Sequence, residues 1–203
     1  VIEKGLPTAG LLAYIMVSKY ADHLPLTRLE GIFARHGISL SRKTMAGWVD
    51  TVASLLEPVV MAMLAVVLTS LKLHTDDTPV PVLDRTRDRT REGRLWVFVG
   101  DEEHPYIVYG YSPNKKQDFI LKVLGNYEGY LQADAAPGYD ALFAKATLSE
   151  VACWMHARRG FFDAKGSDEL RALTAMAFIR LLYAVEKEAK GLLSRLHPLA
   201  ADT

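Results

Sequence analysis

The chain has 203 residues, with 24 basic and 24 acidic side chains, so its formal net charge is +0. This length can form one sizeable core, or a catalytic domain with a small appendage. The neutral balance argues against a dedicated nucleic-acid-binding domain, which is usually basic, although a local basic patch could still grip phosphate. The single cysteine, Cys153, excludes a disulfide framework within the chain and fits a cytoplasmic location.

The longest apolar run extends from residue 59 to 71, interrupted by Thr69 and Ser70. A membrane span needs roughly 20 apolar residues, so this run predicts a buried helix and no membrane association. No basic segment leads into a cleavage site, so we expect no signal peptide. The chain begins with Val1 rather than Met, and we expect it to be a piece of a longer protein.

Residues 1–70 predict a helical subdomain. Apolar residues recur at helical spacing over 9–19, 26–35 and 41–56, and Ser41 can cap the third helix. Pro58 suits the first turn of a fourth helix.

The second and third of these helices, residues 26–56, resemble a helix-turn-helix. Arg42 and Lys43 open the second helix of the pair and could reach a DNA major groove. The alternative is a helical hairpin packed on a catalytic core, which Met45 and Trp48 favour because they supply a face for burial.

Residues 71–203 predict an α/β domain, because the apolar period changes to two from Lys72 onward. The expected strands span residues 73–83, 95–99, 106–111, 130–133 and 150–155. The expected helices span residues 114–124, 139–145, 157–164 and 168–193. Three antiparallel strands followed by two strands in αβ crossovers would form a mixed five-stranded sheet in the ribonuclease H-like order.

Three acidic residues are candidates for one site: Asp76 and Asp134 in strand-like segments, and Glu186 late on the last helix. If they converge, their oxygens could hold two Mg²⁺ or Mn²⁺ ions, which is the arrangement that phosphodiester chemistry uses. Aspartates at strand ends are also common as turn residues. Glu186 lies beside an apolar stripe, but Glu188 flanks the other side, so periodicity favours Glu186 only modestly.

Two neighbours of these acids are further candidates. Alternation cannot choose between Asp76 and Asp77, because a central strand is covered on both faces. Tyr183 lies one helical turn before Glu186 and could orient its carboxylate, with core packing as the alternative.

Several segments, in this order, closely resemble transposases of the insertion sequence 66 family: HTDDTPVPVL, GRLWVFVGD, LQADAAPGYDAL, CWMHARRGFFDA and IRLLYAVEKEAKGL. That family is a branch of the DDE transposases, with a ribonuclease H-like catalytic core. The resemblance implies metal-dependent cleavage at the ends of a mobile element and joining of the freed 3′ hydroxyls to target DNA. It also implies that the active complex is a homo-oligomer. Family members are longer than this chain, so recognition of the DNA ends could lie outside it.

The resemblance also implies the site residues. Asp76, Asp134 and Glu186 correspond to the catalytic acids that hold two magnesium or manganese ions, and Asp77 to the acidic residue that follows the first. Residues 71–203 then form the catalytic core.

Cys153 and His156 have the spacing of half a zinc site, but no second such pair exists, so we expect no closed zinc site. We expect His156 and Arg159 to approach the scissile phosphate or an active-site carboxylate, and Arg158 is a weaker candidate. The alternative is a hydrogen-bonded histidine with two solvated arginines.

A basic loop joins the first two expected strands, over residues 84–94. It could grip the DNA backbone, and added salt would then weaken binding. The alternative is a solvated hairpin tip with ion pairs of its own. The DNA-contact candidates in this loop are Arg85, Arg87, Arg89 and Arg91.

Two functions of other classes stay open. The chain could be a DNA-binding or assembly module without catalysis of its own, or a nuclease or resolvase on the same fold. Manganese-dependent nicking of terminal-repeat DNA would argue against the first, and nicking without strand joining would favour the second.

Overall fold

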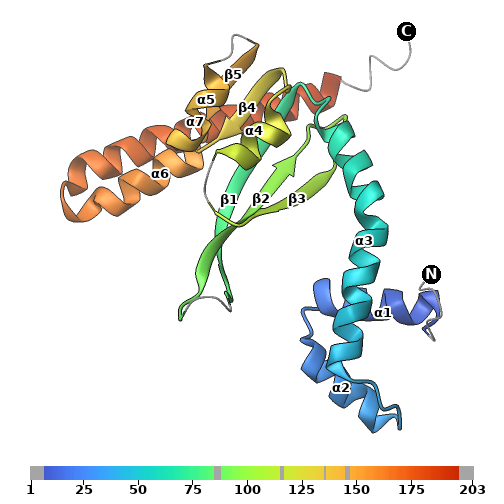
Figure 1. Ribbon diagram of the computed structural model, residues 1–203. Coiled ribbons are helices and arrows are strands. Elements are labelled where there is room, and N and C mark those ends of the chain that lie inside the picture. The colour runs from blue at the N-terminus through green and yellow to red at the C-terminus, as the bar shows by residue number, and fades with distance from the viewer. Residues whose placement is uncertain (1–6, 85–87, 115–116, 135, 145–146, 197–203) are drawn as a thin grey trace. The chain divides into compact units, whose positions relative to one another are not determined.

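The computed structural model describes residues 7–84, 88–114, 117–134, 136–144 and 147–196, and side chains as far as residue 191. By its contacts the chain divides into two compact units, Val1–Ala65 and Val66–Thr203. The first unit is helical, and the second contains the sheet (Figure 1).

The helical unit consists of α1 (Ala9–Tyr20), α2 (Leu26–Arg35) and most of α3 (Arg42–Val67). Its core contains Ile15, Leu29, Phe33 and Met45, and Trp48 packs against them. Ser41 accepts a hydrogen bond from the amide of Thr44 at 3.1 Å, which confirms the predicted cap of α3.

Two predictions for α3 are wrong. Pro58 lies inside one continuous helix rather than at the start of a new one. Its ring fixes φ near the helical value, so the helix loses a hydrogen bond without having to end there. The first part of the apolar run is not buried either: Val59, Val60 and Met61 are all exposed, whereas Val67 near the end of the helix is buried. The core of the unit covers only the first turns of α3, which carry Met45 and Trp48.

Within the described residues, α3 is the one helix long and apolar enough to cross a membrane, judged by length and composition alone. A single helix of this kind is weak evidence for a membrane span.

The second unit contains a five-stranded sheet in the order β3-β2-β1-β4-β5. Neighbours are antiparallel from β1 to β3, and parallel between β1 and β4 and between β4 and β5. The predicted mixed five-stranded α/β sheet is therefore confirmed. The strands are β1 (Lys72–Val82), β2 (Arg91–Val99), β3 (Ile107–Ser112), β4 (Gly129–Ala133) and β5 (Leu148–Ala152).

Strand β1 is continuous through both of its prolines. Pro79 and Pro81 lie opposite Arg94 and Glu92 of β2. On its other side, β1 pairs with β4 only over residues 72–74, so the prolines lie where β1 has a single neighbour. A missing amide is tolerated at such an edge.

The helices of this unit are α4 (Asp118–Leu124), α5 (Asp140–Phe143), α6 (Trp154–Asp163) and α7 (Glu169–Leu196), with 3₁₀ turns η1 (Pro137–Tyr139) and η2 (Ala164–Gly166). One prediction needs correction here. The strand expected over 150–155 ends at Ala152, and Cys153 is the N-cap of α6. Helices α6 and α7 pack side by side (Figure 1).

One sheet face is covered by α4 and η1. Trp96 of β2 stacks near Phe119 of α4, with ring centroids 5.8 Å apart, and near Tyr139 of η1 at 6.4 Å. The Trp96 indole donates a 2.9 Å hydrogen bond to the Ser112 hydroxyl. This packing places η1, and the segment before it, against the middle of the sheet.

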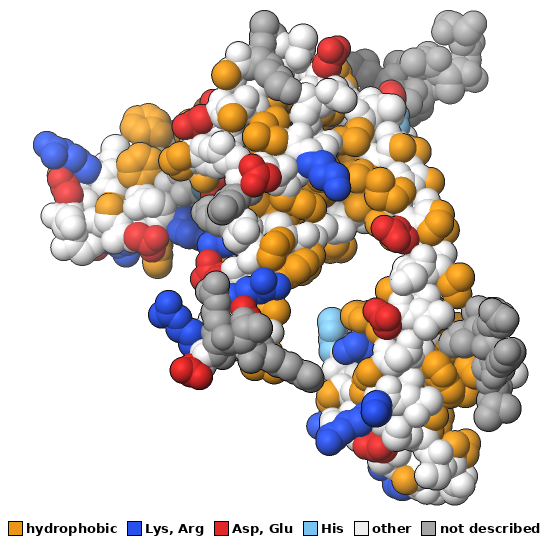
Figure 2. Space-filling view, in the orientation of Figure 1, with side chains coloured by type: hydrophobic (Ala, Val, Ile, Leu, Met, Phe, Trp, Pro, Cys, Tyr) orange, Lys and Arg blue, Asp and Glu red, His pale blue; other side chains and the backbone are white. Residues whose placement is uncertain are grey.

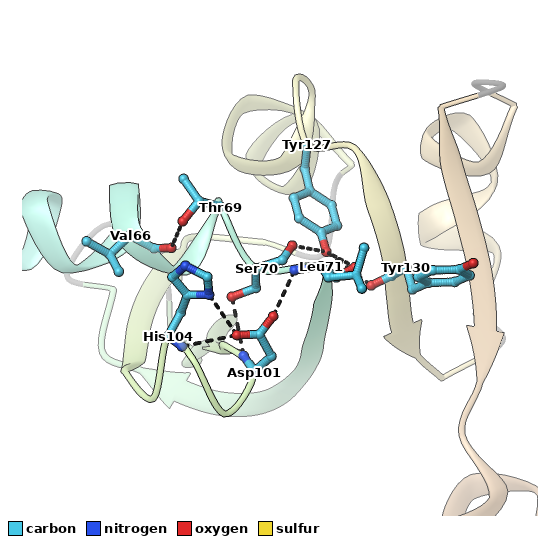
Figure 3. A network of polar contacts seen from close by, with 8 residues as sticks. All are labelled: Val66, Thr69, Ser70, Leu71, Asp101, His104, Tyr127 and Tyr130. Carbon is cyan, nitrogen blue, oxygen red and sulfur yellow. Dashed lines mark hydrogen bonds and ion pairs between the residues drawn. The ribbon is translucent and has the colours of Figure 1, made fainter. Parts of the chain in front are cut away.

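A polar network fixes the start of β1 (Figure 3). Asp101, after β2, accepts hydrogen bonds from the Leu71 amide at 2.8 Å and the His104 amide at 3.0 Å. The His104 side chain lies 2.7 Å from the same carboxylate, and this hydrogen bond is the main cause of the lowered pKa of Asp101. The Tyr127 hydroxyl donates to the Ser70 carbonyl at 3.0 Å, and burial raises the pKa of Tyr127 to about 12.

Candidate active site

The sheet register brings two of the predicted acids to one level. His74 of β1 pairs with Gln132 of the parallel strand β4. Asp76 lies two residues after His74, and Asp134 lies two residues after Gln132. Asp134 comes immediately after β4, which ends at Ala133. Both residues therefore follow the paired stretch of β1 and β4 at the same end of β4, and His156 lines pockets with each of them.

Asp76 presents a largely free carboxylate. Its side chain is 52 % exposed, and one oxygen accepts a hydrogen bond from the Asp77 amide at 2.8 Å. The other oxygen, Oδ2, lies 3.8 Å from Nε2 of His156. Asp76 can therefore accept a ligand without losing a structural ion pair.

Asp77 is placed differently from its neighbour. Its side chain is only 5 % exposed and forms an ion pair with Arg94 of β2 at 2.9 Å. Arg94 also binds Glu92. Because strand neighbours point to opposite faces, this pair holds Asp77 on the face away from Asp76.

Asp134 has a buried oxygen, Oδ1, with no hydrogen-bond partner among the described residues. A buried acceptor without a partner costs free energy, so this atom is suited to a ligand. Burial and then the nearby Asp134 carboxylate raise the pKa of Tyr139, with smaller contributions from Asp77 and Asp76. Tyr139 therefore stays protonated close to all three aspartates.

His156 lies between the two aspartates. It lines a pocket of about 150 Å³ with Asp76, and a second pocket of about 380 Å³ with Asp134. Cys153 lines both pockets as well. The other ring nitrogen of His156, Nδ1, is buried and has no partner among the described residues.

Glu186 is not brought to these pockets. Its carboxylate is exposed on α7, lies 3.3 Å from Nζ of Lys190, and lines a separate pocket of about 280 Å³ with Trp154 and Tyr183. Within the described residues, no group of three histidine, cysteine or acidic side chains is close enough to hold a metal ion. The predicted role of Glu186 stays a prediction.

Glu186 is nevertheless not remote from the sheet. The pKa of His74, on β1, is lowered by burial first and then by the charges of Lys72 and Lys190. Lys190 is the residue that contacts Glu186. The part of α7 that carries both residues therefore lies within electrostatic reach of β1.

Arg158, Arg159 and Tyr183 remain candidates. Arg158 and Arg159 are exposed on α6. Arg158 and Tyr183 line a further pocket, of about 480 Å³, beside α7.

The predicted DNA-contact residues are exposed where the structure describes them. Arg42 and Lys43 open α3, where the Arg42 amide donates to Glu30 at 3.0 Å. Arg89 and Arg91 line an open hollow at the end of the β1–β2 hairpin, where basic side chains are visible in Figure 2. Arg85 and Arg87 lie outside the described residues.

The donor set fits a hard divalent cation. Asp76 and Asp134 supply carboxylate oxygens, which Mg²⁺ and Mn²⁺ prefer. Oδ1 of Asp134 is buried without a hydrogen-bond partner among the described residues, so a cation could bind it.

Sequence reasoning missed Tyr139 and Arg94 as parts of this site. Tyr139 gave no signal beyond its position five residues after Asp134. Arg94 belonged to the basic loop, and its pairing with Asp77 follows from a strand register that the sequence does not state.

Comparison with known proteins identifies the family of the chain. The family model described as transposase, IS66 family, matches residues 4–199. Two uncharacterized proteins of Sinorhizobium fredii, y4qI and y4jD, are 34 % and 33 % identical to the chain over 94 % of its length. The chain spans 38 % and 40 % of the lengths of these relatives. The chain belongs to the IS66 family of transposases.

Proposed function

We propose that this chain carries the ribonuclease H-like catalytic core of a DDE transposase, which cleaves the ends of a mobile element and joins the 3′ hydroxyls to target DNA. The observation that carries this proposal is that Asp76 and Asp134 each follow the paired stretch of the parallel strands β1 and β4 by two residues, with His156 lining pockets beside both. Family membership and the strand order of the mixed sheet support it.

In this proposal Asp76, Asp134 and Glu186 are the catalytic acids and would hold two magnesium or manganese ions. The ions would activate the attacking oxygen and stabilise charge on the leaving oxygen. Glu186 is the least constrained of the three, because its exposed carboxylate contacts only Lys190 among the interactions described above.

The residues around the aspartates have distinct roles. The Asp77–Arg94 pair neutralises a second carboxylate next to Asp76, so Asp77 does not compete for the same ligand. His156 lies near enough to orient the Asp76 carboxylate, or to donate a proton to a bound phosphate oxygen. Tyr139 keeps its proton and serves as a neutral neighbour of Asp134.

DNA is the proposed substrate and partner. Arg89 and Arg91 at the hairpin end, with Arg158 and Arg159 on α6, are the described cations that would contact phosphates. The chain spans less than half the length of these relatives, so we assign recognition of a particular terminal DNA sequence to none of its residues.

The test is manganese-dependent nicking of supercoiled plasmid DNA by this chain. Asp134→Asn should reduce the nicking rate by about a thousandfold, which is ~4 kcal/mol of barrier. The matched control is Asp140→Asn, an exposed aspartate six residues later, which should nick at the wild-type rate. Equal rates for Asp134→Asn and wild type would sink the assignment of Asp134.

The same assay separates the other candidate functions. A second assay adds a linear DNA with free 3′ hydroxyls and asks whether it becomes joined to the plasmid. Nicking without joining would favour a nuclease or resolvase. Neither nicking nor joining, with DNA binding intact, would favour a non-catalytic assembly module.

A further inference from the structure

Helix α3 has an apolar surface that the chain's described core does not cover. The first turns pack on the helical unit through Met45 and Trp48. Every residue from Ala53 to Ala62 is exposed, and the side chains of Leu55 and Val59 are each more than half exposed. A helix that is apolar over most of its surface is normally buried, so this stretch calls for a partner.

The sequence of α3 follows a seven-residue repeat that points to another helix as that partner. Position a of the repeat is occupied by Met45, Val52, Val59 and Val66. Position d is occupied by Trp48, Leu55 and Ala62. An apolar a/d repeat of this kind is the seam of a coiled coil.

Three of the four charged residues of α3 follow the same repeat. Lys43, Asp50 and Glu57 all occupy position f, which faces away from the seam in a coiled coil. Glu57 is the one Lys, Arg, Asp or Glu between residues 51 and 67. Pro58 falls at position g and does not interrupt the helix. Beyond Arg42, which lies at position e at the start of the helix, charge is therefore confined to the face that pairing would leave in water.

The seam continues an interface that the molecule already uses. Met45 and Trp48, its first a and d residues, are covered by the core of the helical unit. The a and d residues from Val52 to Val66 extend the same stripe beyond that core, over 15 residues or about 22 Å of helix. The free part of the seam is thus held in a helix that is already formed.

We propose that α3 is a dimerisation helix, which pairs in parallel with α3 of a second copy of this chain along Val52, Leu55, Val59, Ala62 and Val66. Valine at all three free a positions, with Leu55 at one of the two free d positions, is the combination that favours two parallel strands. No charged side chain lies along the free seam to oppose self-pairing. Dimerisation can be measured whether or not the protein cuts DNA, so this proposal and the proposed catalysis fail separately.

The first experiment measures the mass of the chain by sedimentation across a concentration series. The wild type should rise from 22.6 kDa toward twice that mass. Val59→Glu, which places a charge in the seam, should stay at the mass of one chain at every concentration. The matched control, Val60→Glu, changes the adjacent exposed valine at position b and should dimerise like the wild type.

A second experiment reads the direction of the pairing. Val52→Cys and Val66→Cys, each made with Cys153→Ser so that it carries the chain's single cysteine, are treated with a short bismaleimide cross-linker. A parallel pair places each residue beside its own copy, so both variants should cross-link. Val60→Cys should not.

Three results would overturn the proposal. One is a wild type that stays monomeric at the highest concentration, whether α3 is covered by another part of the chain or by a lipid bilayer. The second is an equal response of Val59→Glu and Val60→Glu. The third is cross-linking of Val59→Cys without Val52→Cys and Val66→Cys, which would indicate antiparallel helices.

Discussion

The two strand-borne aspartates and the helix-borne glutamate of the candidate site are positioned by different means. Asp76 and Asp134 each follow the paired stretch of β1 and β4 by two residues, and they share His156 as a neighbour. Glu186 depends on how α7 packs, and its carboxylate is exposed beside Lys190. Backbone hydrogen bonds thus define one half of the site, whereas side-chain packing leaves the other half open.

This difference predicts that substitutions of the three acids have different effects on metal affinity but similar effects on the rate of DNA cleavage. Asp76→Asn, Asp134→Asn and Glu186→Gln should each slow plasmid nicking by about a thousandfold. In the DNA-free protein, Mn²⁺ affinity measured by electron paramagnetic resonance should fall at least about tenfold for the two aspartate variants. It should be nearly unchanged for Glu186→Gln.

Glu188→Gln, an exposed glutamate two residues away on α7, is the control and should match the wild type in both assays. If Glu186→Gln lowered Mn²⁺ affinity as strongly as Asp134→Asn, the helix-borne acid would already be part of the resting site and the contrast would be lost.

The ion pair beside the strand-borne aspartates should contribute more to the free energy of unfolding than the ion pair of Glu186. Arg94→Met leaves Asp77 buried without its partner and should lower the free energy of unfolding by about 3 kcal/mol. Lys190→Met breaks the exposed pair with Glu186 and should change it by less than about 0.5 kcal/mol. Urea unfolding measures both, and similar losses would contradict the contrast.

The register itself can be disturbed at the start of β4. Gly129 has a φ of +128°, and an added Cβ would lie 2.6 Å from the Leu71 carbonyl oxygen. Gly129→Ala should therefore destabilise the protein by about 2 kcal/mol, and it should weaken Mn²⁺ binding because β4 leads directly into Asp134. Gly138→Ala, where an added Cβ meets no atom within 4 Å, should have little effect on either quantity.

The smallest expected effect concerns acid stability at the start of β1. The pKa of Asp101 is lowered chiefly by its hydrogen bond with the His104 side chain. A lowered pKa contributes stability above the unfolded value of 3.8, and this is lost as the pH falls through the folded value. Thermal melts below about pH 4 should therefore fall more steeply for wild type than for Asp101→Asn. Parallel curves would exclude this source of acid sensitivity.

The sequence predicted the helices and strands well, because apolar periodicity reports burial directly. The prediction failed where the surrounding structure overrides a rule based on local sequence. Pro58 and the β1 prolines, Pro79 and Pro81, usually end an element, yet here each lies where the missing amide is tolerated. Cys153 and the residues after it read as strand, but they begin α6.

The site was predictable in part. Resemblance singled out Asp76 over Asp77, and the structure gives a physical difference: Asp77 is buried and paired with Arg94, whereas Asp76 is half exposed with His156 3.8 Å away. The neighbourhood of Tyr139 and the placement of Glu186 depend on tertiary packing, which no local pattern encodes. The seven-residue repeat of α3 is present in the sequence, but only the structure shows that its apolar stripe is exposed.

The most direct test of the account is a crystal of this protein soaked in manganese and measured for anomalous scattering. We expect a peak coordinated by Asp76 and by Oδ1 of Asp134, with His156 alongside. A well-ordered crystal with both carboxylates visible and no peak between them, at manganese concentrations that support nicking, would contradict it.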